Sequence, residues 1–170
     1  LDQKLRNFTQ ERLTHEDVSW DYSEVNSDAA RGLARNSALA DLIVLSSVSG
    51  GEDNSVTIGI LGDVLFNCRV PVVVQPDSVK KFAAAGPVIV AWNGSLEAGN
   101  ALRGSVPLLR MASDVHIVTV AEPDKDHDFP SLAASEYLSR HGISSEVHAP
   151  RASESTVQAA LLSSADAISA

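Results

Sequence analysis

The chain has 170 residues, 44% of them hydrophobic but only 5% aromatic, so that Ala, Val, Leu and Ile must build one good core or two small ones. Its formal net charge of −9 argues against nucleic acid and anionic membranes as partners, because no face can become strongly basic without making another still more acidic. The single cysteine excludes an internal disulfide and favours a cytoplasmic location, and no apolar run approaches the roughly 20 residues that span a bilayer.

The first forty residues predict two helices with a strand between them. Residues 1–13 read as an amphipathic helix, residues 18–25 as an edge strand of alternating apolar and polar residues, and residues 28–39 as a second helix. Ser27 or Asp28 is expected to cap that second helix. The first helix is expected to turn its apolar side chains toward a core; these are Leu5, Phe8 and Leu13.

The next elements alternate between strand and helix. Residues 41–46 predict a buried strand, residues 47–55 a loop, residues 56–68 a helix, and residues 71–75 a second strand. Residues 76–87 read as a linker, which ends in a Gly-Pro pair.

A strand, turn, helix and strand then follow in order. The apolar residues 88–92 stop at Asn93, Gly94 and Ser95, where glycine frees the backbone and serine is a good helix N-cap. Residues 96–112 carry an apolar stripe of roughly helical spacing, and residues 115–120 are again nearly all apolar. The turn at Asn93 is therefore expected at the carboxyl end of a parallel strand, where open α/β sheets bind ligands.

The last forty-odd residues predict a loop and a final pair of helices around a strand. Residues 122–130 are acidic and turn-like, residues 132–141 form a helix ended by Gly142, and residues 143–149 form a strand. Ser153 or Ser155 is expected to cap a last helix of Ala and Leu that reaches Ile168.

Several of these segments resemble the universal stress protein family. The run Val88-Ile-Val-Ala-Trp-Asn-Gly-Ser95 is similar to the opening of such a domain, where the usual turn is Asp-Gly-Ser. Three segments resemble its closing half: Ala40-Asp-Leu-Ile-Val-Leu45, Leu61-Gly-Asp-Val64 and Val70-Pro-Val-Val-Val74. The resemblance implies an α/β fold with a Rossmann-like, open, mostly parallel sheet flanked by helices, as in the adenine nucleotide alpha hydrolases.

The order of these segments is inverted, with a domain end first and a domain start second. On this interpretation residues 1–80 are the C-terminal part of a first domain, and residues 81–170 are the N-terminal part of a second. The alternative is that both halves complement each other in one circularly permuted domain. A faint repeat of strand and Ala-rich helix, about one domain length apart, fits either organisation.

The resemblance also implies where ATP would bind. The acid that family members place near the nucleoside corresponds to Asn93, whose amide can still hydrogen-bond a ribose hydroxyl, and Gly94 and Ser95 follow it. In the first half, the glycine loop of the family falls on Ser46, Ser49 and Gly62, with Gly50 and Gly51 as partial replacements. The hydroxyl position there is Asp63, which would set a carboxylate against phosphate. Nucleotide binding is therefore expected to be weak or lost in the first loop.

Other polar residues favour structural roles. His116 lies inside an apolar strand and is interpreted as a packed, hydrogen-bonded core residue, and Cys68 as a small buried hydrophobe. The acidic residues from Asp124 to Asp128 are interpreted as a solvated loop, so that no metal is predicted. Ser95 lacks the Gly-x-Ser-x-Gly pattern of hydrolases, and no catalytic residue is predicted.

The expected function is a non-enzymatic binding or regulatory module in stress response. The alternative is an ATP-binding relative that hydrolyses ATP slowly; a flavin or nicotinamide protein is disfavoured because no Gly-x-Gly-x-x-Gly is present. The edge strand Val70 to Val74 is apolar on both faces, and we expect it to pair domains or to join two chains in a homodimer.

Overall fold

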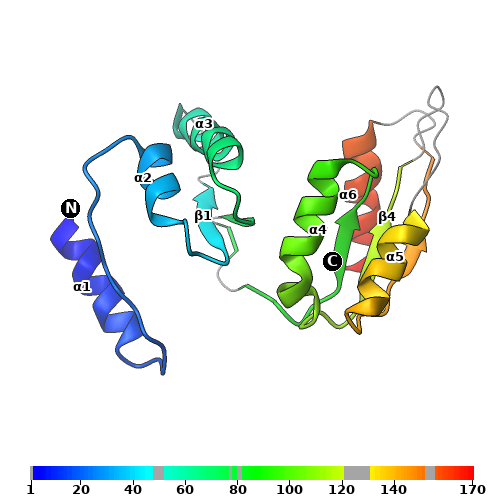
Figure 1. Cartoon of the computed structure of the whole chain (residues 1–170), viewed down its shortest axis with the longest axis horizontal. Coiled ribbons are helices and arrows are strands. Elements are labelled where there is room, and N and C mark those ends of the chain that lie inside the picture. Colours follow the sequence, from blue (N-terminus) through cyan, green and yellow to red (C-terminus); the bar gives the residue numbers. More distant parts are fainter. Residues whose placement is uncertain (1, 48–51, 77, 80–81, 121–130, 152–155) are drawn as a thin grey trace.

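In a computed structural model, the chain forms two parallel sheets, each with its own helices (Figure 1). The structure describes residues 2–47, 52–76, 78–79, 82–120, 131–151 and 156–170. Within these ranges, no helix is both long enough and apolar enough to cross a membrane. Every strand pairing is parallel, which confirms the predicted fold class.

The N-terminal half contains a two-stranded sheet and three helices. Its elements are α1 (Asp2–Leu13), α2 (Ala29–Asn36), β1 (Ile43–Ser47), α3 (Glu52–Asn67) and β2 (Val72–Pro76). Asp28 caps α2 as predicted, because its carboxylate accepts a hydrogen bond from the Arg31 backbone N–H at 3.2 Å. The register pairs Ile43 with Val72 and Val44 with Val73.

One face of this sheet is covered and the other is open. Ile43 of β1 is buried against Val64 of α3 and Cys68, the residue directly after α3. Val44 points to the opposite face and is 63% exposed, so the strand predicted as fully buried is covered on one side only. Cys68 is a buried free thiol, as its sequence context predicted.

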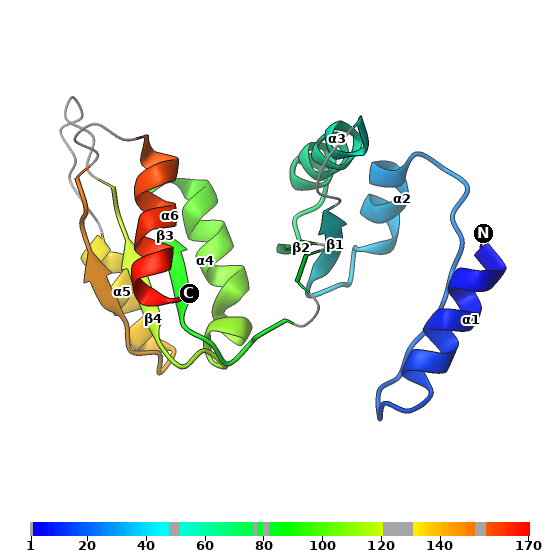
Figure 2. The ribbon, with the colours of Figure 1, turned by 180° about the vertical axis from the view of Figure 1, so that it is seen from behind.

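Three expectations for this half were wrong. Residues 18–25 form no strand, because alternation of side chains cannot supply a partner strand, and Val18 and Val25 are exposed. The helix α1 forms, but Leu5 and Phe8 are exposed, and α1 lies apart from both sheets (Figures 1 and 2). The helix predicted from residue 56 begins earlier, at Glu52.

The C-terminal half is a three-layer α/β unit. Its elements are β3 (Val88–Ala91), α4 (Leu96–Leu109), β4 (Val115–Val118), α5 (Ser131–Arg140), β5 (Glu146–His148) and α6 (Val157–Ile168). The strand order is β3-β4-β5. Helices α4 and α5 cover one face of the sheet, in front of it in Figure 1, and α6 lies on the other face, toward the viewer in Figure 2.

The core of this half lies between the sheet and the pair α4 and α5. Ile117 of β4 and Leu138 of α5 are fully buried there, together with Leu102 and Val106 of α4. Gly142 ends α5 with φ of +75°, as predicted for a residue in the left-handed region. The N-cap of α6 is Thr156 rather than either predicted serine; Ser153 and Ser155 lie outside the described residues, as does the predicted acidic loop.

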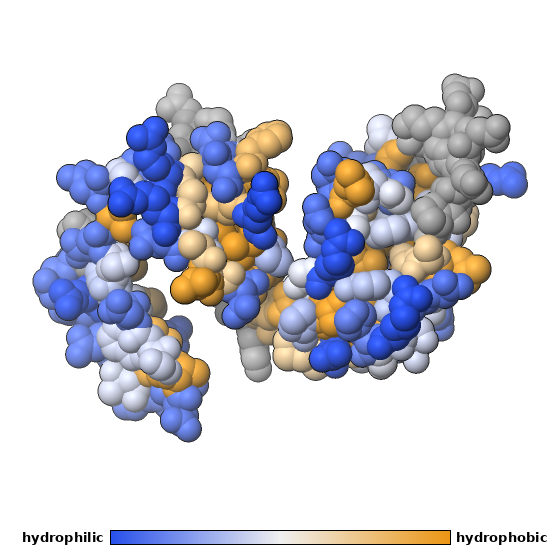
Figure 3. Space-filling view, viewed as in Figure 1, coloured by the Kyte–Doolittle hydropathy of each residue, from blue (hydrophilic) through white to orange (hydrophobic). Residues whose placement is uncertain are grey.

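The two halves meet where α4 approaches the start of β2. Gly104 of α4 lies so close to Pro71 that a Cβ at position 104 would overlap the Pro71 ring. Figure 3 shows apolar surface interspersed with hydrophilic surface on both halves. Leu39 and Phe66 are large apolar residues of the N-terminal half that are exposed.

Candidate functional site

The predicted turn after β3 has the geometry of an Asx turn followed by a capped helix. The Asn93 side-chain oxygen Oδ1 accepts a hydrogen bond from the Ser95 backbone N–H at 3.0 Å. Gly94 has φ of +75°, a conformation that favours glycine because it has no Cβ. Ser95 then caps α4, as predicted, because its hydroxyl Oγ accepts from the Ala98 N–H at 3.1 Å.

The surroundings place this turn at the carboxyl edge of the sheet. The Trp92 N–H donates to the carbonyl of Val118 at 2.9 Å, which extends the β3–β4 ladder up to the turn. Asn93 and Gly94 are exposed beyond it. The Ser95 cap takes up the Ala98 N–H, which leaves the N–H groups of Leu96 and Glu97 at this end of α4, where the helix dipole favours an anion. The arrangement can bind a polar or anionic group, although Glu97 in the first turn of α4 opposes a strong negative charge.

The residues predicted from the first half do not gather in one place. Ser46 is exposed near the carboxyl end of β1, where the prediction places a ligand. Gly62 and Asp63 lie inside α3, about 15 Å along the helix from its first residue. Ser49, Gly50 and Gly51 lie outside the described residues.

Asp63 faces a different part of the molecule. With Asp28, Arg31 and Asn67, it lines a shallow hollow of about 290 Å³ between α2 and α3. A Cβ at Gly62 would meet nothing within 4 Å, so packing alone does not require glycine there.

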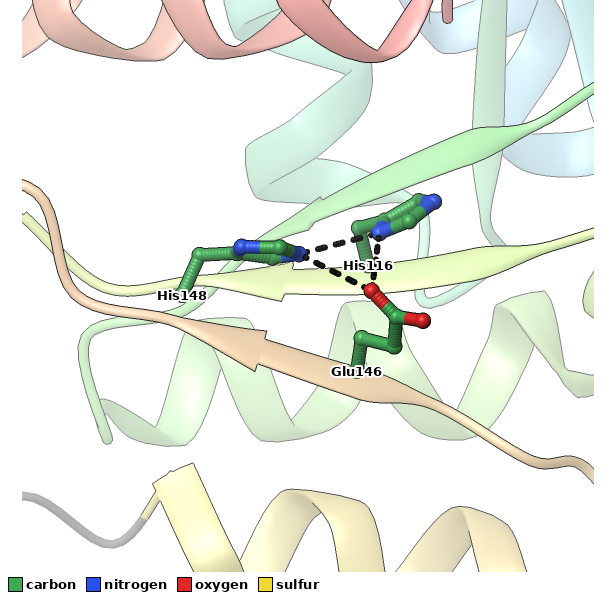
Figure 4. A group of neighbouring side chains, drawn as sticks. All are labelled: His116, Glu146 and His148. Carbon is green, nitrogen blue, oxygen red and sulfur yellow. Dashed lines mark hydrogen bonds and ion pairs between the residues drawn. The ribbon is translucent and has the colours of Figure 1, made fainter.

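A second group of polar side chains lies on the sheet of the C-terminal half. His116 of β4 faces Glu146 and His148 of β5, and the three side chains converge over the two strands (Figure 4). His116 Nδ1 lies 3.0 Å from His148 Nε2, and each of these atoms lies 3.7 Å from Glu146 Oε2. His116 is hydrogen-bonded in a strand, as expected, and its side-chain partner is His148 of the neighbouring strand.

Sequence reasoning missed this group because its members are far apart in the chain. The one local signal is Glu146-x-His148 on a strand, since residues two apart share a face. Only the pairing of β4 with β5 brings His116 opposite Glu146.

Comparison with known proteins identifies the fold. No protein-family model and no curated sequence matches the chain. Among solved structures, a universal stress protein from Archaeoglobus fulgidus DSM 4304 is similar, with a TM-score of 0.75 and 18% sequence identity. The similarity covers 99% of this chain and 63% of the other, so the chain spans less than two thirds of that protein. This chain therefore has the α/β fold of a universal stress protein, with open parallel sheets flanked by helices.

Proposed function

We propose that the chain is a binding or regulatory module and that its nucleotide site is the turn Asn93–Ser95. The observation that carries the proposal is the exposed Asx turn at the carboxyl end of β3, directly before the N-terminus of α4. Backbone N–H groups at such a turn and the helix dipole suit a phosphate, and the Asn93 amide suits a ribose hydroxyl.

For the first half we propose that nucleotide binding is weak or lost. Asp63 and Gly62 lie in the interior of α3, where backbone N–H groups are used by the helix itself. If a phosphate did come close to Asp63, the negative charge of the carboxylate would repel it. Ser46 alone remains near the strand end among the described residues of this predicted set.

We further propose that residues 1–80 and residues 81–170 belong to two tandem domains. The separate sheets of the two halves support this organisation, as does the similarity to only 63% of the Archaeoglobus protein. The open face of the first sheet, with Val44 exposed, is what an incomplete domain would present.

Calorimetric titration with MgATP tests the nucleotide site. Asn93→Ala should weaken binding about tenfold, the factor that corresponds to losing one hydrogen bond of roughly 1.4 kcal/mol. Asn100→Ala, an exposed change on α4, is the matched control and should leave the affinity unchanged. Asp63→Ser should also leave it unchanged, because Asp63 lies far along α3.

Two results would overturn this assignment. Equal affinity of the parent and the Asn93→Ala variant for MgATP would show that the ligand does not bind at the turn. A higher affinity of Asp63→Ser would show that phosphate binds beside α3. Measurement of phosphate release in the same samples separates a binding module from the alternative, a relative that hydrolyses ATP slowly.

A further inference from the structure

We propose that His116, Glu146 and His148 form a binding site for a divalent transition-metal ion, with Zn²⁺ as its best occupant. The donor atoms are His116 Nδ1, His148 Nε2 and Glu146 Oε2. This site shares no residue with the proposed nucleotide turn, so either proposal can fail without the other.

The backbone of the sheet puts the three residues together. In the parallel ladder His116 pairs with Glu146, and Val118 pairs with His148. Glu146 and His148 are two residues apart on β5 and therefore share a face with His116. That face is opposite the one that packs on α4 and α5, because the intervening Ile117 belongs to the buried core.

The distances between donor atoms match the size of a metal ion. The three atoms form a triangle with sides of 3.0, 3.7 and 3.7 Å. The point equidistant from them lies about 2.0 Å from each, which is the bond length that Zn²⁺ makes to imidazole nitrogen and carboxylate oxygen. An ion at that point would lie in the plane of the three donors, so small rotations of the Glu146 and His148 side chains are needed to bring them to three corners of a tetrahedron.

A hydrogen bond between the two histidines accounts for the position of Glu146 less well than a bound cation does. Two imidazole nitrogens at 3.0 Å are satisfied by one shared proton, with one ring donating and the other accepting. That hydrogen bond leaves Glu146 Oε2 at 3.7 Å from both nitrogens, too far for a hydrogen bond to either. A cation at the centre would instead bond all three donors at once.

The group is buried on the side of His116 and exposed to solvent on the side of Glu146. The His116 side chain is 13% exposed, that of His148 39%, and that of Glu146 74%. An ion could enter from the Glu146 side and keep a water molecule as a fourth ligand, as in zinc sites with three protein ligands. Two nitrogens and one oxygen suit Zn²⁺ and Co²⁺, whereas Ca²⁺ and Mg²⁺ prefer all-oxygen sites.

Zinc titration of the whole, tag-free chain after dialysis against a chelator tests the site. One Zn²⁺ should bind per chain. Glu146→Gln keeps the size of the exposed side chain but removes its charge, and His148→Gln removes a nitrogen ligand. Loss of a ligand should weaken binding by roughly 100-fold or more, since loss of an outer partner alone costs 10- to 100-fold.

The matched control is His141→Gln, directly after α5, where the ring packs at a tilt against Tyr137 with centroids 4.6 Å apart. This variant should bind Zn²⁺ as the parent does. Co²⁺ in place of Zn²⁺ gives a visible absorption band that should appear in the parent and the control but disappear in His148→Gln.

Circular dichroism on each variant shows whether the fold is retained, and Glu146→Gln changes a side chain too exposed to be needed for folding. The proposal is overturned if the parent binds no stoichiometric Zn²⁺, or if Glu146→Gln and His148→Gln both bind as tightly as the parent. The second result would place the ion on other residues.

Discussion

At the scale of single residues, two glycines of the same helix differ in how much space surrounds them. Gly99 and Gly104 both lie in α4, where glycine costs about 1 kcal/mol relative to alanine. A Cβ at Gly99 would lie 3.6 Å from Arg103 Nη1, which is ordinary contact. A Cβ at Gly104 would overlap the ring of Pro71, so this glycine permits the two halves to touch.

Substitution by alanine at these two positions should therefore change the free energy of unfolding in opposite directions. Gly99→Ala should raise the free energy of unfolding by up to about 1 kcal/mol, because it improves helix propensity. Gly104→Ala should lower it by about 1–3 kcal/mol, because the new methyl group forces Pro71 away. Urea denaturation of both variants measures the difference. If Gly104→Ala stabilises the protein as Gly99→Ala does, Pro71 does not rest on α4 in solution.

At the scale of elements, the edge strand β2 is the feature most open to a partner. Within the described part of the chain, β2 pairs only with β1, so its other edge has free backbone groups. Its Val73 side chain lies on the same open face as Val44 of β1. We propose that two chains, or two tandem domains, associate along this edge.

A charge on β2 should weaken that association. Val73→Lys is expected to shift sedimentation toward monomer at concentrations where the parent associates, because an edge lysine opposes strand pairing. Val44→Lys is the matched control, since it puts the same charge on the same face of the neighbouring strand. A parent that stays monomeric at high concentration contradicts the proposal, and an equal effect of both substitutions indicates association through the face instead.

Elements defined by local signals could be predicted from the sequence. The strand, the polar turn at Gly94 and the helix capped by Ser95 follow from a polar break between an apolar run and a helical stripe. The strand expected at residues 18–25 failed because a strand needs a partner, which local alternation does not reveal. The group of His116 and His148 was missed because 32 residues separate the two rings, and only the pairing of strands joins them.

At the scale of the whole molecule, the two halves contribute unequally to the candidate function. The C-terminal half presents a turn at a sheet edge and, apart from it, the group His116, Glu146 and His148, for which we propose metal binding. In the N-terminal half, Ser46 lies near the carboxyl end of β1, whereas Asp63 lies near the C-terminal end of α3. The two predicted residues are therefore not parts of one site. We therefore propose nucleotide binding at the turn after β3 and not in the N-terminal half.

Amide chemical shifts during an ATP titration test that assignment most directly. In ¹H–¹⁵N spectra, the signals of Gly94, Ser95 and the first turn of α4 should move in proportion to saturation, because a bound phosphate changes the field at these N–H groups. The signals of Ser46 and Asp63 should stay in place. Movement of Ser46 and Asp63 without movement of Gly94 and Ser95 would contradict the account.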